Sequence, residues 1–253
     1  TYPPPYTKPQ PKTRLISLPV PKTHMADLEF LVDYFPPRAI ELQIRQRLLL
    51  LAVQKGRVAT VEFLLRYCPP TRVESQAVHS SILSGSERLV SAILSTDQFI
   101  INRQFAFGGT PLITACESGQ QPEFLKFLLN RGADPNMKCA TSKLSALEYL
   151  AGASQLLSPG NRATASIALM LNSGAKIQRP EVLMAAVRQG REDVVGYLLE
   201  QRLLRAERER GPHDKSVLHV AASGGSTGIM RILFKHGVDV SSMNEEGKTA
   251  MQV

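Results

Sequence analysis

The tripeptide Gly247-Lys248-Thr249 raises the question of nucleotide binding, because Gly-Lys-Thr ends the phosphate-binding loop of many nucleotide-binding proteins. That loop needs a preceding strand and another glycine five residues before Gly247, where this chain has Ser242. Glu245 and Glu246 come directly before the tripeptide, and their carboxylates would repel a phosphate. We therefore expect a structural role for the tripeptide and no bound cofactor.

The histidines and cysteines do not match a known metal-binding pattern. His213 and His219 are six residues apart, but no cysteine pair accompanies them as a zinc site would need. The cysteines are odd in number and form no Cys-x-x-Cys pair, so we expect small buried side chains in a reducing compartment. The residues in question are His24, His79, His213, His219, His236, Cys68, Cys116 and Cys139. We predict no metal site.

Composition and catalytic motifs give no sign of an enzyme. The chain has no nucleophile elbow, no Cys/His dyad at a recognisable spacing and no paired-carboxylate motif. Its 253 residues, 43% of them hydrophobic, can bury a sizeable core. No signal peptide opens the chain, and no apolar run reaches the roughly 18 residues of a membrane span, so we expect an intracellular protein.

The chain contains two similar decapeptides, and their similarity needs a structural explanation. Residues 28–37 read LEFLVDYFPP and residues 61–70 read VEFLLRYCPP, so matching residues are 33 positions apart. A fixed offset of this size indicates stacked structural repeats. Both decapeptides have helical hydrophobic spacing and end in two prolines, which stop a helix.

The clearest repeat unit is residues 108–136, GGTPLITACESGQQPEFLKFLLNRGADPN. Thr110 can cap a first helix, Pro111 suits its first turn, and Ala115 is small enough for a second helix to approach. Gly119 and Gly132 allow positive φ at the two turns. This unit resembles the ankyrin repeat, and the resemblance extends over about residues 24–253.

The glycines that end the first helices give the register of the other repeats. Gly56, Gly85, Gly119, Gly190 and Gly225 hold this position. One repeat is longer, because 42 residues separate Gly132 from Gly174 and about nine extra residues lie around 154–161. We predict an all-α ankyrin solenoid of stacked helix-turn-helix units with short finger loops over residues 23–253. Its predicted repeats are about 39–73, 74–104, 105–138, 141–178, 179–213 and 214–246, with a partial repeat at 24–37 and a truncated one at 247–253.

Residues 1–22 form a proline-rich basic arm before these repeats. The arm has seven prolines, four positive charges and no acidic residue, so we expect an extended, polyproline-like segment. It either packs Leu15, Ile16, Leu18 and Val20 along the solenoid or acts as a disordered tether; the sequence leaves both open.

The resemblance implies a non-catalytic module that binds a protein partner through its concave face and finger loops. Candidate contacts are Gln54, Lys55, Glu117, Arg188 and Gln189 on first helices, and Arg103, Phe105, Phe107, Lys138 and Arg179 at finger tips. Basic residues outnumber the single acid in this set, so we expect a positive strip that attracts an acidic segment. Phe105 and Phe107 are either exposed anchors or packed against the adjacent repeat. At the histidine position of the repeat, His79 and His219 are expected to hydrogen-bond to neighbouring backbone.

Two other functions stay open as alternatives. The net charge of +8 allows a basic binder of nucleic acid or acidic membrane, although the arm lacks a Lys/Arg cluster. The chain also stops within a repeat, so it could be the adaptor region of a longer multidomain enzyme. A solenoid whose repeats touch only their neighbours rarely forms a deep pocket, so we predict no enzyme. The sequence identifies neither the partner nor the oligomeric state.

Overall fold

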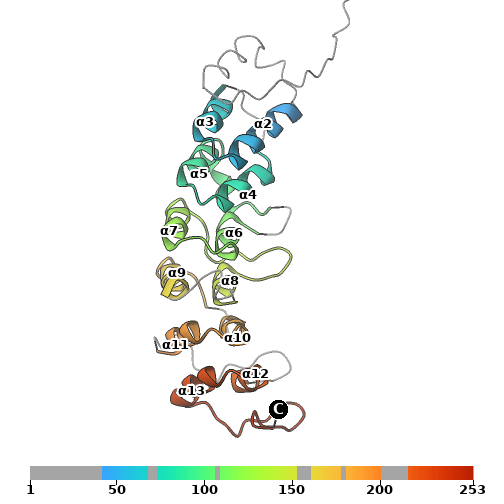
Figure 1. Cartoon of the computed structure of the whole chain (residues 1–253), viewed down its shortest axis with the longest axis vertical. Coiled ribbons are helices and arrows are strands. Elements are labelled where there is room, and N and C mark those ends of the chain that lie inside the picture. Colours follow the sequence, from blue (N-terminus) through green and yellow to red (C-terminus); the bar gives the residue numbers. More distant parts are fainter. Residues whose placement is uncertain are drawn as a thin grey trace, which may run out of the picture.

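The computed structural model describes residues 42–67, 73–105, 109–152, 161–177, 181–200 and 216–252. These residues form twelve α-helices and one short 3-10 helix, η1, without a β-strand, and Figure 1 shows the α-helices stacked in a long array. The helices are α2 (Leu42–Gln54), α3 (Val58–Tyr67), α4 (Ser75–Leu83), α5 (Glu87–Leu94), η1 (Gln98–Asn102), α6 (Pro111–Glu117), α7 (Pro122–Asn130), α8 (Ala146–Gly152), α9 (Asn161–Asn172), α10 (Glu181–Arg188), α11 (Glu192–Glu200), α12 (Val217–Ser223) and α13 (Thr227–Lys235). The predicted all-α solenoid is confirmed for this part of the chain.

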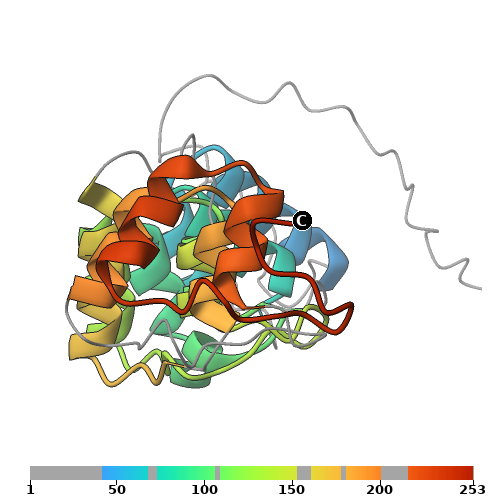
Figure 2. The ribbon, with the colours of Figure 1, turned by 90° about the horizontal axis from the view of Figure 1, so that it is seen from below.

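The helices lie in two rows. The first-helix row contains α2, α4, α6, α8, α10 and α12, each packed against the next, and the second-helix row contains α3, α5, α7, α9, α11 and α13. Each first helix also packs against the second helix that follows it, which gives six helix pairs in the described residues. Figure 2 looks along the array and shows the two rows side by side. The boundaries that separate one repeat from the next stay a prediction.

Residues at the helix ends explain where helices begin. Thr110 accepts a hydrogen bond from the backbone N–H of Ile113 at 3.3 Å, and Pro111 occupies the first turn of α6, as its sequence predicts. Before α8, Ser145 and Glu148 form a reciprocal capping box: the Ser145 hydroxyl accepts from the Glu148 N–H, and the Glu148 carboxylate accepts from the Ser145 N–H. Both caps satisfy N–H groups that have no partner within their helices.

Small side chains hold the two rows close together. Ala115, Ala151, Ala186 and Ala221 lie on four first helices, and each has an exposed fraction of 0%. Branched aliphatic side chains from both rows surround them and form one continuous core. A larger side chain at an alanine position would push a helix pair apart.

Two asparagines tie successive repeats together at the loops that follow the second helices. The Asn102 side chain donates to the Gly132 carbonyl at 2.9 Å and accepts from the Asp134 N–H at 2.8 Å. Asn136 repeats this pattern on the Gly174 carbonyl and the Lys176 N–H, at 3.0 and 2.8 Å. These side chains satisfy loop backbone groups that no helix can satisfy.

Several predictions fall outside the described residues. They are the arm at 1–22, the partial repeat at 24–37, the side chains of His24, Cys68, Phe107, Arg179 and His213, and the extra residues around 154–161. The helices on either side of that last segment are described: α8 ends at Gly152 and α9 begins at Asn161. None of the described helices has the length and apolar character that crossing a membrane would need.

Candidate functional site

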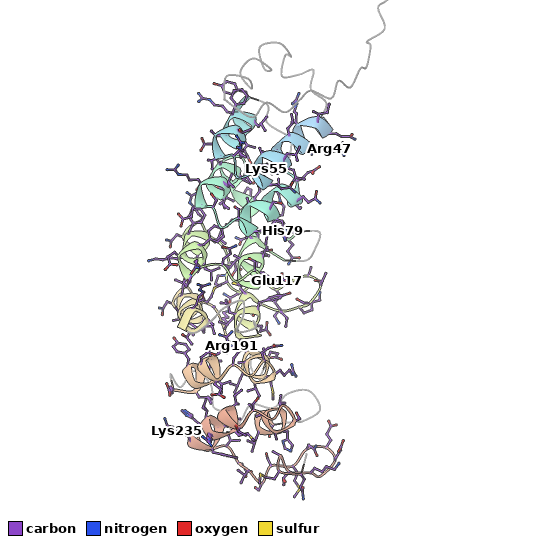
Figure 3. All side chains as sticks on the ribbon, viewed as in Figure 1. Arg47, Lys55, His79, Glu117, Arg191 and Lys235 are labelled. Atoms are coloured by element: carbon purple, nitrogen blue, oxygen red, sulfur yellow. The ribbon has the colours of Figure 1, made fainter. Side chains whose placement is uncertain are left out.

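The exposed ends of the first helices form the main candidate surface. Gln54 and Lys55 lie at the end of α2, Glu117 ends α6, and Arg188 and Gln189 lie at the end of α10, all exposed to solvent. Figure 3 shows Lys55 and Glu117 along the first-helix row. The sequence therefore placed these five side chains on one row of helix ends. None of them takes part in the core.

The order of charges along this row differs from the expected single strip. Lys55 and Arg188 are separated by three helices, because α4, α6 and α8 lie between α2 and α10. Glu117 lies in this interval and places a negative charge between the two positive ones. The exposed row therefore alternates in charge and does not form one continuous positive surface.

The same row has an apolar member that was not among the predicted contact residues. Leu83 ends α4 two residues before Gly85 and has an exposed fraction of 48%. Gln54, Glu117 and Arg188 stand two residues before their own turn glycines, so Leu83 holds the equivalent place. The glycine register could have identified it. An exposed leucine between polar neighbours offers a partner an apolar contact.

One finger loop presents a basic residue. Lys138 is exposed and pairs with Ser145 in an isolated antiparallel bridge. The preceding finger is linked to it, because the Gln104 amide donates to the Lys138 carbonyl at 2.8 Å. The backbone of Lys138 is thus fixed while its side chain is exposed to solvent.

Two finger-tip candidates are used inside the fold instead. The Phe105 ring has an exposed fraction of 4% and lies edge-on to the His79 ring, with ring centres 5.9 Å apart. Packing against the adjacent repeat, one of the two alternatives, is therefore correct for Phe105, and it is not a contact residue in this structure. Arg103 forms an ion pair with Asp97, and its side chain is 18% exposed. Its guanidinium is already partly satisfied.

His219 and the tripeptide Gly247-Lys248-Thr249, which raised the questions of metal and phosphate binding, have structural roles. His219 is buried; its ring bonds the Ser216 hydroxyl at 2.7 Å and the Lys248 carbonyl at 2.9 Å. The Asn244 side chain accepts from the N–H groups of Glu246 and Lys248, both at 3.0 Å. These N–H groups are therefore occupied by a side chain of the same loop.

The described cysteines are buried and do not form a metal site. Burial raises the pKa of the Cys116 thiol well above its ordinary value. Desolvation also raises the pKa of Cys139, but hydrogen bonds from Ser142 and Thr141 outweigh it and lower this pKa to about 6. The Cys139 side chain is 3% exposed and lies 3.2 Å from the Thr141 hydroxyl. Within the described part of the chain, no three His, Cys, Asp or Glu side chains gather as a metal would require.

Comparison with known proteins identifies the repeat. The family model "Ankyrin repeats (3 copies)" matches residues 41–139 and 183–253. The stretch between the two matches contains the long connection from α8 to α9. A search of curated protein sequences finds no match.

Solved structures show the same fold. The ankyrin repeat domain of human ASB11 is 21% identical, with a TM-score of 0.65, and the match covers 81% of this chain and 90% of that one. The ankyrin repeat domain of Bcl-3, described as a unique member of the IkappaB protein family, is 20% identical with a TM-score of 0.64, covering 81% and 92%. At these identities the likeness concerns the fold alone.

Proposed function

Because the chain belongs to the ankyrin repeat family, we propose that it is a non-catalytic module that binds a protein partner along the first-helix row and the adjoining finger loops. Ankyrin repeat domains are in general protein–protein interaction modules and are typically non-catalytic. Stacked repeats give an extended, continuous surface, which suits recognition by shape and area.

The observation that carries the proposal is the set of exposed side chains at equivalent ends of successive first helices. Core packing does not explain Lys55, Leu83, Glu117 and Arg188, since all four face solvent. The buried alanines of the first-helix row fix the helices, so the row is presented on a rigid support. A rigid surface loses little conformational entropy when a partner binds.

The partner we propose offers an acidic segment. Lys55, Lys138 and Arg188 are exposed, and none of them forms an ion pair with another described residue. An acidic helix or extended segment could form charge-assisted hydrogen bonds with these three groups, while Leu83 supplies an apolar contact. Glu117 would favour a partner whose acidic groups are interrupted near the middle of the row.

The test compares two sets of charge reversals in partner recovery from cell extract. The test variant is Lys55→Glu, Lys138→Glu, Arg188→Glu. The matched control is Lys126→Glu, Arg231→Glu, Lys235→Glu, which reverses three exposed charges on the second-helix row. Helical circular dichroism checks that both variants fold. We expect the test variant alone to lose a protein partner that the wild type binds directly when purified.

Salt dependence adds a second measurement. Raising salt from about 50 to about 500 mM should slow association with the purified partner more than it speeds release, because exposed charges act mainly on encounter. Equal recovery by both variants would contradict the proposal. Recovery of nucleic acid or lipid alone would instead favour the basic-binder alternative.

A further inference from the structure

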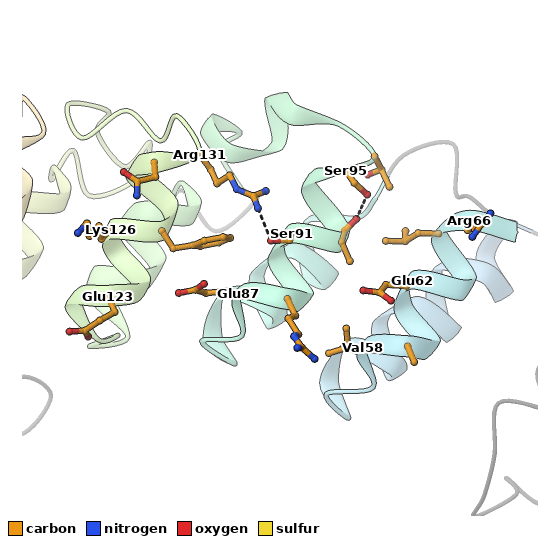
Figure 4. Close-up of a pocket in the computed structure, with 16 residues that line it drawn as sticks. Val58, Glu62, Arg66, Glu87, Ser91, Ser95, Glu123, Lys126 and Arg131 are labelled. Carbon is orange, nitrogen blue, oxygen red and sulfur yellow. Dashed lines mark hydrogen bonds between the residues drawn. The ribbon is translucent and has the colours of Figure 1, made fainter.

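A large open groove crosses the second-helix row, away from the ends of the first helices. It has a volume of about 1460 Å³ and is lined by residues of α3, α5 and α7 and the turns that follow α5 and α7 (Figure 4). All the residues of the proposed contact surface lie outside its lining. The groove is therefore a separate feature that the proposed function does not use.

The groove lies where α5 and α7 stand apart. Every other neighbouring pair of second helices in the described part of the chain is in close backbone contact, whereas α5 and α7 hardly touch. α5 begins two residues after Gly85, but α7 begins three residues after Gly119, so the turn before α7 has one extra residue. Within this turn, the Gln120 side chain reaches back and donates to the Leu83 carbonyl at 3.0 Å.

The floor of the groove is made of small side chains. Ser91 and Ala92 are half-buried on α5, and Ser95 caps its C-terminus. On the α7 side, the Arg131 guanidinium lies over the Phe127 ring, 4.9 Å from its centre, and donates to the Ser91 hydroxyl at 3.0 Å. The wall facing a ligand is thus partly aromatic, and the floor leaves room for close approach.

Charges are distributed unevenly along the groove. In Figure 4, Glu87 and Glu123 lie toward the end where α5 and α7 begin, Glu62 lies halfway along α3, and Arg66 and Arg131 lie toward the end where the helices finish. The three carboxylates are exposed and form no ion pair with any described residue. Arg88 follows Glu87 in the first turn of α5, and Lys126 lies halfway along α7. The end where the helices begin thus has two carboxylates and one cation, whereas the other end has only the cations Arg66 and Arg131.

We propose that this groove binds an amphipathic α-helix of a protein partner, aligned along α5. The partner's basic first turns would face Glu62, Glu87 and Glu123, and its acidic last turns would face Arg66 and Arg131. This direction also places the positive end of the partner's helix dipole near the carboxylates and its negative end near the guanidinium groups. The apolar stripe would pack on Leu65, Ala92 and Phe127.

A helix fits the groove better than an extended peptide does. The floor consists of helices whose backbone groups are already hydrogen-bonded, so it offers no edge with which a strand could pair. A helix satisfies its own backbone and needs only side-chain contacts. Small residues one and four positions apart, such as Ser91, Ala92 and Ser95, let another helix approach closely.

A display library of helical peptides tests the proposal. Peptides of about 14 residues span roughly 21 Å, enough to cross the groove along α5. Selection on the wild-type protein should enrich sequences with an apolar stripe, basic N-terminal turns and acidic C-terminal turns. Amide resonances of α5 and α7 should shift when an enriched peptide is added.

A filled-groove variant provides the matched comparison. Ser91→Phe, Ser95→Phe fills the floor, whereas Ala165→Phe, Ser173→Phe changes two exposed small residues on and just after α9. We expect the first variant to bind the enriched peptides at least about tenfold more weakly than the wild type does. The second variant should bind them with unchanged affinity. The Lys55, Lys138 and Arg188 reversals should also have no effect, which separates this test from that of the proposed function.

Charge reversal tests the direction of the bound helix. The double variant Glu62→Lys, Glu87→Lys should bind the enriched peptides more weakly. The control variant Glu181→Lys, Glu200→Lys changes exposed helix ends outside the groove and should bind them with unchanged affinity. The proposal is overturned if enriched peptides bind the filled variant equally well or lack the expected charge order. A dimer that forms through the groove and is lost in the filled variant would assign it to a second copy of the chain and equally refute the proposal.

Discussion

The ion pair between Arg191 and Asp193 allows a sharp test of what fixes α11. The Arg191 side chain has an exposed fraction of 0%, and its guanidinium holds the Asp193 carboxylate at two points, with N–O distances of 3.0 and 2.8 Å. Asp193 is 28% exposed, so the pair is only partly shielded from water. Asp193→Asn keeps the shape and one acceptor but removes the charge.

We expect Asp193→Asn to lower the free energy of unfolding by about 2 kcal/mol at pH 7, because hydrogen bonds to charged groups contribute about 1.5–3 kcal/mol. The effect stays below that of removing a fully buried ion-pair partner, since Asn can still accept one hydrogen bond and water reaches the site. Glu192→Gln is the control: it removes an exposed charge from the same first turn and should cost at most about 1 kcal/mol through the helix dipole.

The difference in unfolding free energy between the wild type and Asp193→Asn should depend on pH with a definite sign. Desolvation raises the pKa of Asp193, but the hydrogen bonds and charge of Arg191 outweigh it and hold this pKa below its ordinary value of 3.8. A carboxylate whose pKa falls on folding stabilises the fold above its unfolded pKa, and this contribution is lost as the pH falls through the folded pKa. The difference between wild type and variant should thus be constant from about pH 7 to 5 and shrink below about pH 4.

Urea unfolding at several pH values measures this difference, and amide hydrogen exchange on α11 localises it. Exchange is needed because repeat arrays can open one unit at a time. A difference under about 0.5 kcal/mol at pH 7, the size of an ordinary surface change, would refute a stabilising role for the pair. A difference that stays constant or grows as the pH falls below about 4 would show that folding does not lower the Asp193 pKa.

Three further sites test the packing by thermal and urea unfolding. Gly196→Ala should stabilise by about 0.5–1 kcal/mol, because Gly196 lies inside α11 and an added Cβ meets nothing within 4 Å. Gly228→Ala is its comparison and should gain less, since its Cβ would meet the Glu192 carboxylate. Phe105→Ala should lower the free energy of unfolding by about 3–5 kcal/mol, because the side chain is buried. A change near zero would indicate that Phe105 is exposed in solution. Asn136→Ala should cost about 1–2 kcal/mol and increase exchange at the Lys176 amide, because two hydrogen bonds are lost.

Local signals in the sequence were sufficient to predict the helices. Thr110 and Pro111 mark a helix start by chemistry that needs only neighbouring residues, and the structure shows the same cap. The turn glycines are an equally local signal. Gly119 and Gly225 have φ angles of 67° and 64°, which residues with a Cβ rarely adopt. Such signals repeat in each unit, which made the register readable from a single chain.

The state of individual finger residues depends on side-chain contacts that no local sequence pattern specifies. Phe105 packs on His79, which is 26 positions earlier and belongs to the preceding helix pair. Arg103 is held by Asp97 from the loop before it. In both cases a long side chain could turn outward or inward, and tertiary contacts determine the outcome. Lys138 has no such partner among the described residues and keeps its expected exposure.

The groove coincides with a local irregularity in the array of repeats. In a solenoid each repeat contacts only its neighbours. α5 and α7 stand apart beside the longer turn at Gln120, while the other neighbouring second helices of the described residues stay in contact. The first-helix row is also unaffected, because α4 and α6 remain packed against each other. Irregular positions on the second-helix row can therefore add a binding surface without disturbing the first-helix row. For this chain the two surfaces belong to different rows of helices, so one partner on each could be bound at the same time.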